Sequence, residues 1–279
     1  MKMLINLILF SICTQISSFN WPNLPFLYRK KTAQQGVQNS KQTINIATFQ
    51  LYDSTNLLNF VMNLYKADKQ SNINAIIICV NNSGGNPGDF NLIHNTILNI
   101  KTRKPVIVIV EDFAYSGGYF AICSASHIIS SETAEVGAIG MYTLLEKHRN
   151  AQLTGKVNSA YKADIDYELF RAGKYKMIAN PHYTLTDDDK EYIQDSLNKA
   201  YKTFYEIVAK SRNLKLDEKE LWAEGKTFIG INALKLGLID SIGGIYEAIE
   251  KAKELITDQN PDMAYNKEVE LINFMPESK

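Results

Sequence analysis

Apolar runs alternate with amphipathic stretches along the first half of the chain. Three β-type runs stand at intervals, INIATFQL at 44–51, AIIICV at 75–80 and PVIVIVED at 105–112. The last two are almost continuously apolar, which is typical of strands that are buried on both faces of a parallel sheet. Two stretches with helical spacing lie between the runs, STNLLNFVMNLYKADK, with Ser54 as the expected N-cap, and FNLIHNTILNIKT. This order predicts an α/β domain with a largely parallel sheet flanked by helices.

The second half of the chain has mainly helical periodicity. Residues 186–213 form a long amphipathic pattern that opens with Thr186 and three aspartates, a strong signal for a helix start. Residues 228–256 have the pattern of a short helix, a short strand and a further helix. We therefore expect one domain over 44–256 with a helical C-terminal part, followed by a peripheral polar tail at 257–279.

Residues 1–43 are expected to form an N-terminal apolar segment and a linker. Lys2 precedes an apolar run from Met3 to Ile12, which is shorter than the ~20 residues of a helix that spans a bilayer. The run resembles the core of a secretory signal or a weak anchor; the alternative is an amphipathic helix that lies on a membrane or on a neighbouring subunit. We expect membrane contact through this segment, in a bacterial-type cell envelope, with a cytoplasmic location as the alternative.

Composition argues against several classes of function. Thirty basic residues balance thirty acidic residues, so the chain has no basic field, and nucleic acid is not an expected partner. The cysteines Cys13, Cys79 and Cys123 form no CxxC pair. Neither a disulfide framework nor a zinc site is therefore expected. The sequence contains no metal or cofactor motif, so we expect no cofactor.

Two glycine-rich turns follow apolar strands and carry candidate chemistry. Ser116 precedes Gly117 and Gly118 where a β-type run ends and a helical run begins, and Gly84 and Gly85 follow the preceding strand. Because ligands gather at the carboxyl ends of parallel strands, both turns are expected at one cleft. The N–H of Gly117 and that of Gly84 or Gly85 would then form an oxyanion hole beside the Ser116 hydroxyl. The alternatives are a serine that only caps a helix and turns that only need glycine.

The combination of segments resembles the protease IV family, the signal peptide peptidase A type of serine proteases, within the ClpP/crotonase-like superfamily. Four segments, which together span about residues 44–250, carry the resemblance: IIICVNNSGGNPG, KPVIVIVEDFAYSGGYFAICSASHIISSETAEVGAIGM, RAGKYKMIANPHYTLTDDDKEYIQ and EGKTFIGINALKLGLIDSIGG. Two positions depart from the family pattern. Ser83 stands where proline is usual, and Ala138 stands where serine is usual. The first departure bears on the rigidity of the glycine turn.

The resemblance implies a Ser/Lys dyad, with Ser116 as the nucleophile and Lys176 as the general base. Lys174, two residues earlier in AGKYK, is the other candidate. Burial among apolar groups would lower the lysine pKa from its ordinary value near ~10.4, and the neutral amine could then accept the serine proton. The resemblance further implies a serine endopeptidase that acts on cleaved signal peptides or other short hydrophobic peptides, and assembly into ring-like or dome-like homo-oligomers.

Three alternatives remain open at the level of the sequence. A Ser-His-Asp triad would need one of the histidines at 94, 127, 148 and 182, of which His148 has the right chain order but lies in LLEKHRN, a solvated context. A crotonase-like acyl-CoA enzyme would share the oxyanion hole without needing the dyad. A non-catalytic relative that binds peptides or scaffolds a membrane complex would need neither.

Overall fold

The structure is a computed structural model that describes residues 43–145, 169–181, 183–261 and 268–274. All of them belong to one unit, Lys41–Lys279. In the described residues the strands are β1 (Ile44–Tyr52), β2 (Ala75–Asn82), β3 (Val106–Tyr115), β4 (His127–Ser130), β5 (Glu135–Gly137), β6 (Thr227–Ile229), β7 (Ser241–Ile242) and β8 (Val269–Asn273). The helices are α2 (Leu57–Lys69), α3 (Pro87–Ile100), α4 (Gly117–Ile122), α5 (Asp187–Arg212), α6 (Lys219–Trp222), α7 (Gly230–Lys235) and α8 (Ile245–Gln259).

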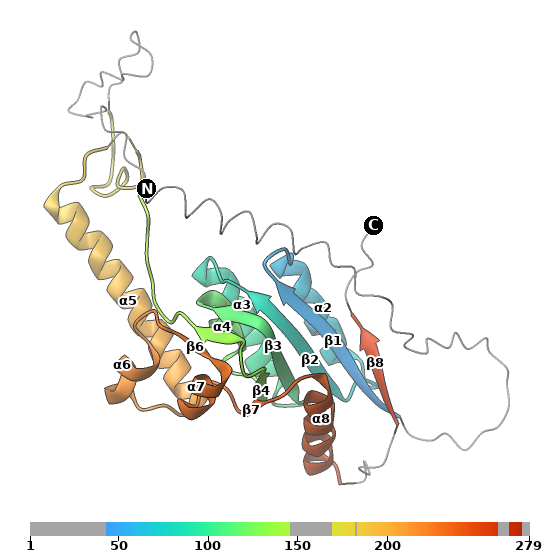
Figure 1. Cartoon of the computed structure of the whole chain (residues 1–279). Helices are drawn as coiled ribbons and strands as arrows, with labels where there is room; N and C mark the ends of the chain where they lie inside the picture. Colours follow the sequence, from blue (N-terminus) through green and yellow to red (C-terminus); the bar gives the residue numbers. More distant parts are fainter. Residues whose placement is uncertain (1–42, 146–168, 182, 262–267, 275–279) are drawn as a thin grey trace, which may run out of the picture. The chain divides into compact units, whose positions relative to one another are not determined.

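The strands form one largely parallel sheet, which confirms the predicted fold class (Figure 1). Its order is β6-β5-β3-β2-β1-β8, and β4 and β7 extend it beside the first half of β3. Only the β5–β6 pair is antiparallel among the pairs of the described strands. The strand β3 therefore lies in the middle of the sheet, and its carboxyl end lies beside the carboxyl end of β2.

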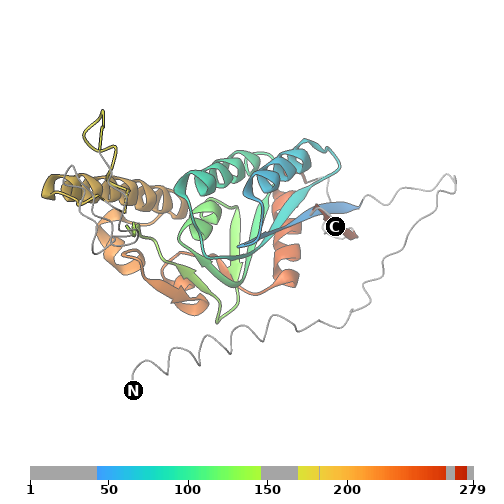
Figure 2. The ribbon, with the colours of Figure 1, turned by 90° about the horizontal axis from the view of Figure 1, so that it is seen from above.

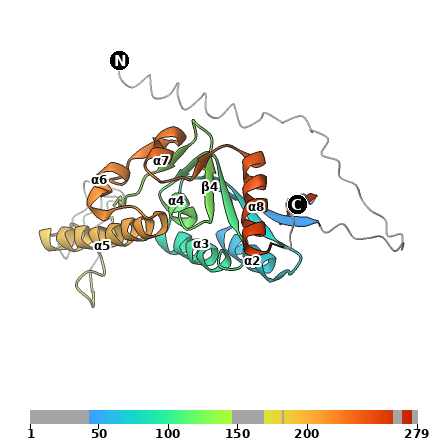
Figure 3. The same ribbon diagram turned by 90° about the horizontal axis from the view of Figure 1, so that it is seen from below.

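Both faces of the sheet are covered, which explains the continuous apolar runs in β2 and β3. Alternate residues of a strand point to opposite faces. Ile76 and Ile78 belong to the core cluster that α2, α3 and α4 cover, whereas Ile77 packs with Ala252 of α8. Figures 2 and 3 show α2 and α3 along one side of the sheet, with α8 on the other side.

The helices predicted along the chain are confirmed, with one corrected N-cap. The first helix was expected to start at Ser54, but its N-cap is Asn56, whose side chain accepts the N–H of Asn59 at 3.0 Å. The reason is a tight turn before it, in which Thr55 and Tyr52 exchange two hydrogen bonds. The long helix α5 begins as predicted at Thr186, with a complete capping box to Asp189.

The C-terminal region contributes a strand that the sequence did not predict. Val269–Asn273 forms β8 and pairs in parallel with β1, so the sheet continues into the predicted polar tail. An edge strand needs few buried side chains, because it can be held by backbone hydrogen bonds to its neighbour. The domain therefore includes residues beyond the predicted limit at 256.

In the part of the chain that the structure describes, no helix is both long enough and apolar enough to cross a bilayer. The apolar run predicted to contact a membrane, Met3 to Ile12, lies outside the described residues.

Candidate active site

Ser116 sits in a strained turn between β3 and α4. Its backbone has φ 47° and ψ −119°, a region that costs energy for a residue with a side chain. The turn is held because the Ser116 N–H donates to the carbonyl of Gly137 at 2.8 Å, while its own carbonyl accepts the N–H of Phe120 at 2.9 Å. The side chain makes no capping hydrogen bond to α4. Ser116 is therefore not an ordinary helix cap, which argues against the alternative of a serine that only caps a helix.

The glycine turn after β2 packs directly against the Ser116 turn. Gly84 and Gly85 have φ 96° and 154°, which residues with side chains rarely adopt. A Cβ on Gly84 would lie 2.6 Å from the nitrogen of Gly117 and 3.1 Å from the Cβ of Ser116. Only glycine fits at 84, and the two turns that were predicted at one cleft do lie side by side.

The three candidate oxyanion donors differ in their hydrogen bonding. The N–H of Gly84 donates to the side-chain oxygen of Asn82 at 2.9 Å and is already engaged. Within the described residues, the N–H groups of Gly85 and Gly117 have no partner. These two groups are neighbours, since a Cβ on Gly117 would lie 3.1 Å from the nitrogen of Gly85. Of the three predicted donors, the N–H groups of Gly85 and Gly117 are thus the two that stay unpaired in the described residues.

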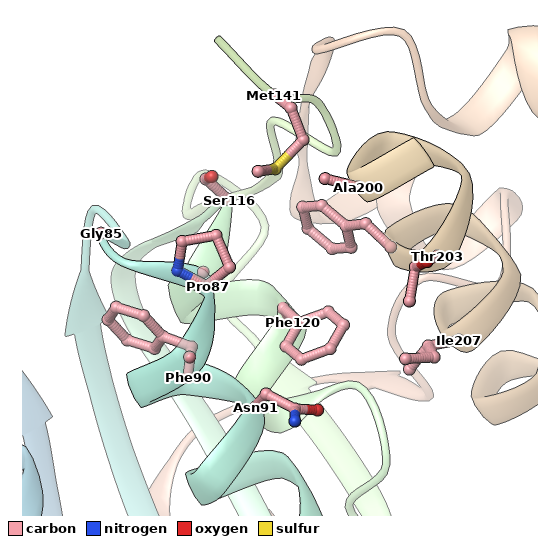
Figure 4. Close-up of a pocket in the computed structure, with 13 residues that line it drawn as sticks. Gly85, Pro87, Phe90, Asn91, Ser116, Phe120, Met141, Ala200, Thr203 and Ile207 are labelled. Atoms are coloured by element: carbon pink, nitrogen blue, oxygen red, sulfur yellow. The ribbon is translucent and has the colours of Figure 1, made fainter. Parts of the chain in front are cut away.

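An apolar cavity of about 340 Å³ opens beside Ser116 (Figure 4). The helices α3, α4 and α5 supply most of its wall, and Figure 4 shows Met141 above Pro87 and Phe120. The apolar side chains that line it are Pro87, Phe90, Phe120, Met141, Phe204 and Ile207. Such a cavity suits an apolar side chain held next to the serine hydroxyl.

A second and more polar cavity of about 550 Å³ shares Ser116 and Met141 with the first. Its wall includes the carboxylate of Glu224, which accepts a hydrogen bond from the Tyr201 hydroxyl at 3.0 Å and pairs with Lys219. The bond from Lys219, more than the one from Tyr201, holds the pKa of Glu224 below its usual range. A carboxylate with a lowered pKa is a poor acceptor for a serine proton.

The two candidate lysines lie in the segment before α5. Lys174 forms an ion pair with Asp188 at 2.6 Å, and this contact raises the pKa of Lys174 and favours its charged form. Lys176 is exposed, and its backbone N–H donates to the carbonyl of Gly173 at 3.2 Å. Neither lysine lines either cavity at Ser116. In the part of the chain that the structure describes, Lys176 therefore shares neither of these cavities with Ser116.

The described histidines have structural roles. His94 is buried, its Nδ1 lies 3.1 Å from the carbonyl oxygen of Phe120, and burial lowers its pKa. His127 begins β4, its Nε2 lies 2.9 Å from the Ser241 hydroxyl, and burial lowers its pKa as well. Neither of them lines a cavity at Ser116. His148 and His182 lie outside the described residues.

Sequence reasoning missed the contribution of α5 to the cavity wall. Ala200, Thr203, Phe204 and Ile207 line the apolar cavity. Their spacing along the helix marks one face, but an amphipathic pattern does not say which part of the protein that face covers. The acceptors that hold the glycine turn, Asn82 and Asp53, were also missed, because short polar residues near turns are common.

The model of Peptidase family S49 matches residues 99–258, more than half of the chain. The chain belongs to peptidase family S49. The matched region of this S49 chain includes the Ser116 turn, both candidate lysines, α5 to α7 and all of α8 except its last residue. The resemblance to the protease IV family is thereby confirmed.

Relatives within the family agree with this membership. The S49 chain is 30% identical to "Protease 4" of Haemophilus influenzae, over 72% of this chain and 31% of that protein. It is also 30% identical to "Serine protease SPPA, chloroplastic" of Arabidopsis thaliana, over 72% of this chain and 28% of that protein. The chain thus spans about a third of the length of these curated relatives.

A solved structure supports the fold. A mutant of the "1510-N membrane-bound stomatin-specific protease" superposes with a TM-score of 0.50 at 17% sequence identity, over 85% of this chain and 100% of that chain. At this identity the match concerns the arrangement of the helices and strands alone.

Proposed function

We propose that this S49 chain is a serine endopeptidase of the signal peptide peptidase type, with Ser116 as its nucleophile. The observation that carries the proposal is the Ser116 turn itself. A serine without a capping role is held at φ 47°, next to two N–H groups, of Gly85 and Gly117, that have no partner in the described residues. A strained serine beside two such donors is suited to acyl transfer.

The proposed chemistry proceeds through an acyl-enzyme. The Ser116 oxygen attacks the peptide carbonyl carbon while its proton passes to a base, and the carbonyl oxygen becomes an oxyanion held by the N–H groups of Gly85 and Gly117. The base then gives the proton to the departing amine as the peptide bond breaks. Water, activated by the same base, attacks the ester and releases the acid and the free serine.

We propose short hydrophobic peptides, including cleaved signal peptides, as the substrates, and the apolar cavity is the observation in favour of them. It lies beside the proposed nucleophile and is lined by Phe90, Phe120 and Phe204. Burying a leucine-sized or phenylalanine-sized side chain there would contribute about 1.5–3 kcal/mol to binding. We also propose that the N-terminal segment keeps the chain near the membrane where such peptides are released.

The general base in this proposal is Lys176. Lys174 is a weaker candidate, because its ion pair with Asp188 stabilises the charged ammonium. Since Lys176 lines neither cavity of its own chain, it has two routes to Ser116. The segment before α5 rearranges within one chain, or Lys176 of one copy reaches Ser116 of a second copy in a homo-oligomer.

A serine-reactive fluorophosphonate and a short hydrophobic peptide test the proposal with five proteins. The wild type should label and cleave, and Ser116→Ala and Lys176→Ala should each lower kcat/KM by about a thousandfold or more. Lys174→Ala is the matched control and should retain activity, as should His148→Ala. Loss of activity with His148→Ala in place of Lys176→Ala would indicate a triad, and a wild type that neither labels nor cleaves would contradict the proposal. Mixing Ser116→Ala with Lys176→Ala chains separates the two routes, because only a site shared between copies regains activity.

A further inference from the structure

The glycine turn of residues 83–86 needs an anchor if it is to hold an oxyanion donor in place. Two consecutive glycines, Gly84 and Gly85, lose more conformational freedom on folding than any other pair of residues. Gly85 is also exposed. A donor that stabilises an oxyanion must nevertheless be placed accurately, since a shift of ~1 Å can cost about a hundredfold in rate. Something outside the two glycines must therefore fix this turn.

The anchor comes from the neighbouring strand. In the parallel pair of β1 and β2, Tyr52 lies opposite Asn81, so the residue after β1 lies beside the start of the glycine turn. That residue is Asp53. Its Oδ1 accepts two hydrogen bonds from Ser83, one from the backbone N–H at 2.7 Å and one from the hydroxyl at 2.9 Å. Hydrogen bonds to a carboxylate are stronger than those between neutral groups.

The anchored residue is joined directly to the catalytic surroundings. Ser83 lines the polar cavity that also contains Ser116, and it is followed by Gly84, which abuts the Ser116 turn. On the other side of Ser83, the buried side chain of Asn82 accepts the N–H of Gly84 at 2.9 Å. The backbone N–H groups of Ser83 and Gly84 are thus engaged by Asp53 and Asn82. The N–H of Gly85 has no partner in the described residues.

We propose that Asp53 is a positioning residue for the oxyanion hole. Its carboxylate fixes Ser83 and, through the chain, the direction of the Gly85 N–H. Proline at position 83 would have no N–H to donate and a fixed φ. The two hydrogen bonds to Asp53 thus restrict the backbone at Ser83, as the ring of a proline at this position would do. This inference rests on the proposed peptidase function.

Kinetics with a hydrophobic peptide substrate test the role of Asp53. Asp53→Ala should lower kcat about tenfold and leave KM within about twofold, because the oxyanion donor acts in the transition state and not in substrate binding. Asp53→Asn keeps an oxygen acceptor at the same place and should retain most of the activity. Ser54→Ala, the adjacent exposed position, is the matched control and should behave as the wild type.

A double-mutant cycle with Ser83→Pro tests whether Asp53 acts through Ser83. Proline removes both donors that Asp53 holds, so Asp53→Ala should have no further effect on kcat in the Ser83→Pro background. An equal loss of kcat in both backgrounds would overturn the proposal. So would an Asp53→Ala variant with unchanged kcat, or one whose loss lies in KM alone.

Hydrogen exchange of the amides in residues 81–89 provides a readout that does not depend on activity. Asp53→Ala should speed exchange in this segment while Ser54→Ala should not, and unchanged exchange in Asp53→Ala would overturn the anchor. Labelling of the wild type by the fluorophosphonate tests the proposed function separately. If the wild type does not label, the proposed peptidase function is wrong. If the wild type labels but Asp53→Ala has the same kcat, only the positioning role of Asp53 is wrong.

Discussion

At the scale of single residues, the site depends on positions that accept few replacements. Ser116 is held in a conformation that is unusual for serine, and Gly84 touches the backbone of Gly117 so closely that a methyl group would not fit. Strain of this kind persists only where the surrounding structure fixes it. The hydrogen bond from the Ser116 N–H to Gly137 is one such constraint.

Gly84→Ala should lower kcat/KM by about a hundredfold, because the new Cβ would meet the nitrogen of Gly117 and displace the two turns. Cleavage kinetics on a short hydrophobic peptide measure the effect. The control is Gly244→Ala, which lines neither cavity at Ser116 and where an added Cβ would come no nearer than 4.0 Å to the Glu247 carboxylate. This variant should stay within about twofold of the wild type. Similar losses in both variants would mean that close contact at 84 is not the cause.

At the scale of elements, α5 links a structural role with a functional one. Its N-terminus is closed by the capping box of Thr186 and Asp189. At its C-terminus, Arg212 is bound to Asp240, which also accepts the N–H of Ile128 in β4. With both ends held, the middle of the helix presents Ala200 and Phe204 to the apolar cavity.

Ala200→Phe should narrow the range of peptides that the cavity admits. The larger side chain would occupy part of the ~340 Å³ cavity, so kcat/KM should fall about tenfold or more for a peptide with leucine or phenylalanine at the cleavage site. For a peptide with alanine there, the change should be under about threefold. Lys202→Phe, on the exposed face of α5, should alter neither value, and an equal loss for both peptides in Ala200→Phe would contradict the assignment of the cavity.

At the scale of the whole molecule, two core clusters lie on opposite faces of one sheet. Two histidines are withdrawn from solvent in this structure. His94 in α3 is buried, and His127, the first residue of β4, is half-buried. Burial lowers the pKa of both His94 and His127, so the folded state disfavours their protonation.

Stability should therefore fall on acidification from pH 7.5 to pH 5.5. In the unfolded chain both histidines titrate near ~6.5, whereas in the folded chain they titrate lower. Below about pH 6.5 the unfolded chain takes up protons that the folded chain does not, so the free energy of unfolding decreases as the pH falls toward the lowered pKa values. Urea unfolding at the two pH values measures this. His94→Leu should show a smaller decrease than the wild type, and an equal decrease would exclude His94 as a cause.

The sequence by itself determined the features that depend on local patterns. Continuous apolar runs predicted the buried strands β2 and β3, helical spacing predicted α3 and α5, and the serine and glycines marked the two turns. These signals are local, because a strand or a helix is specified by neighbouring residues and a turn by the few residues within it. The family was indicated separately, by the resemblance of four segments to the protease IV family.

Only the tertiary structure decided the features that join distant parts of the chain. The pairing of β8 with β1 spans more than 200 residues, and the bonds from Ser83 to Asp53 span 30. That Lys176 lines neither cavity at Ser116 is likewise visible only in the folded chain. The hydrogen bond that occupies the Gly84 N–H, and so separates Gly84 from Gly85, depends on the folded shape of the turn. Such contacts follow from strand register and packing, which local periodicity does not encode.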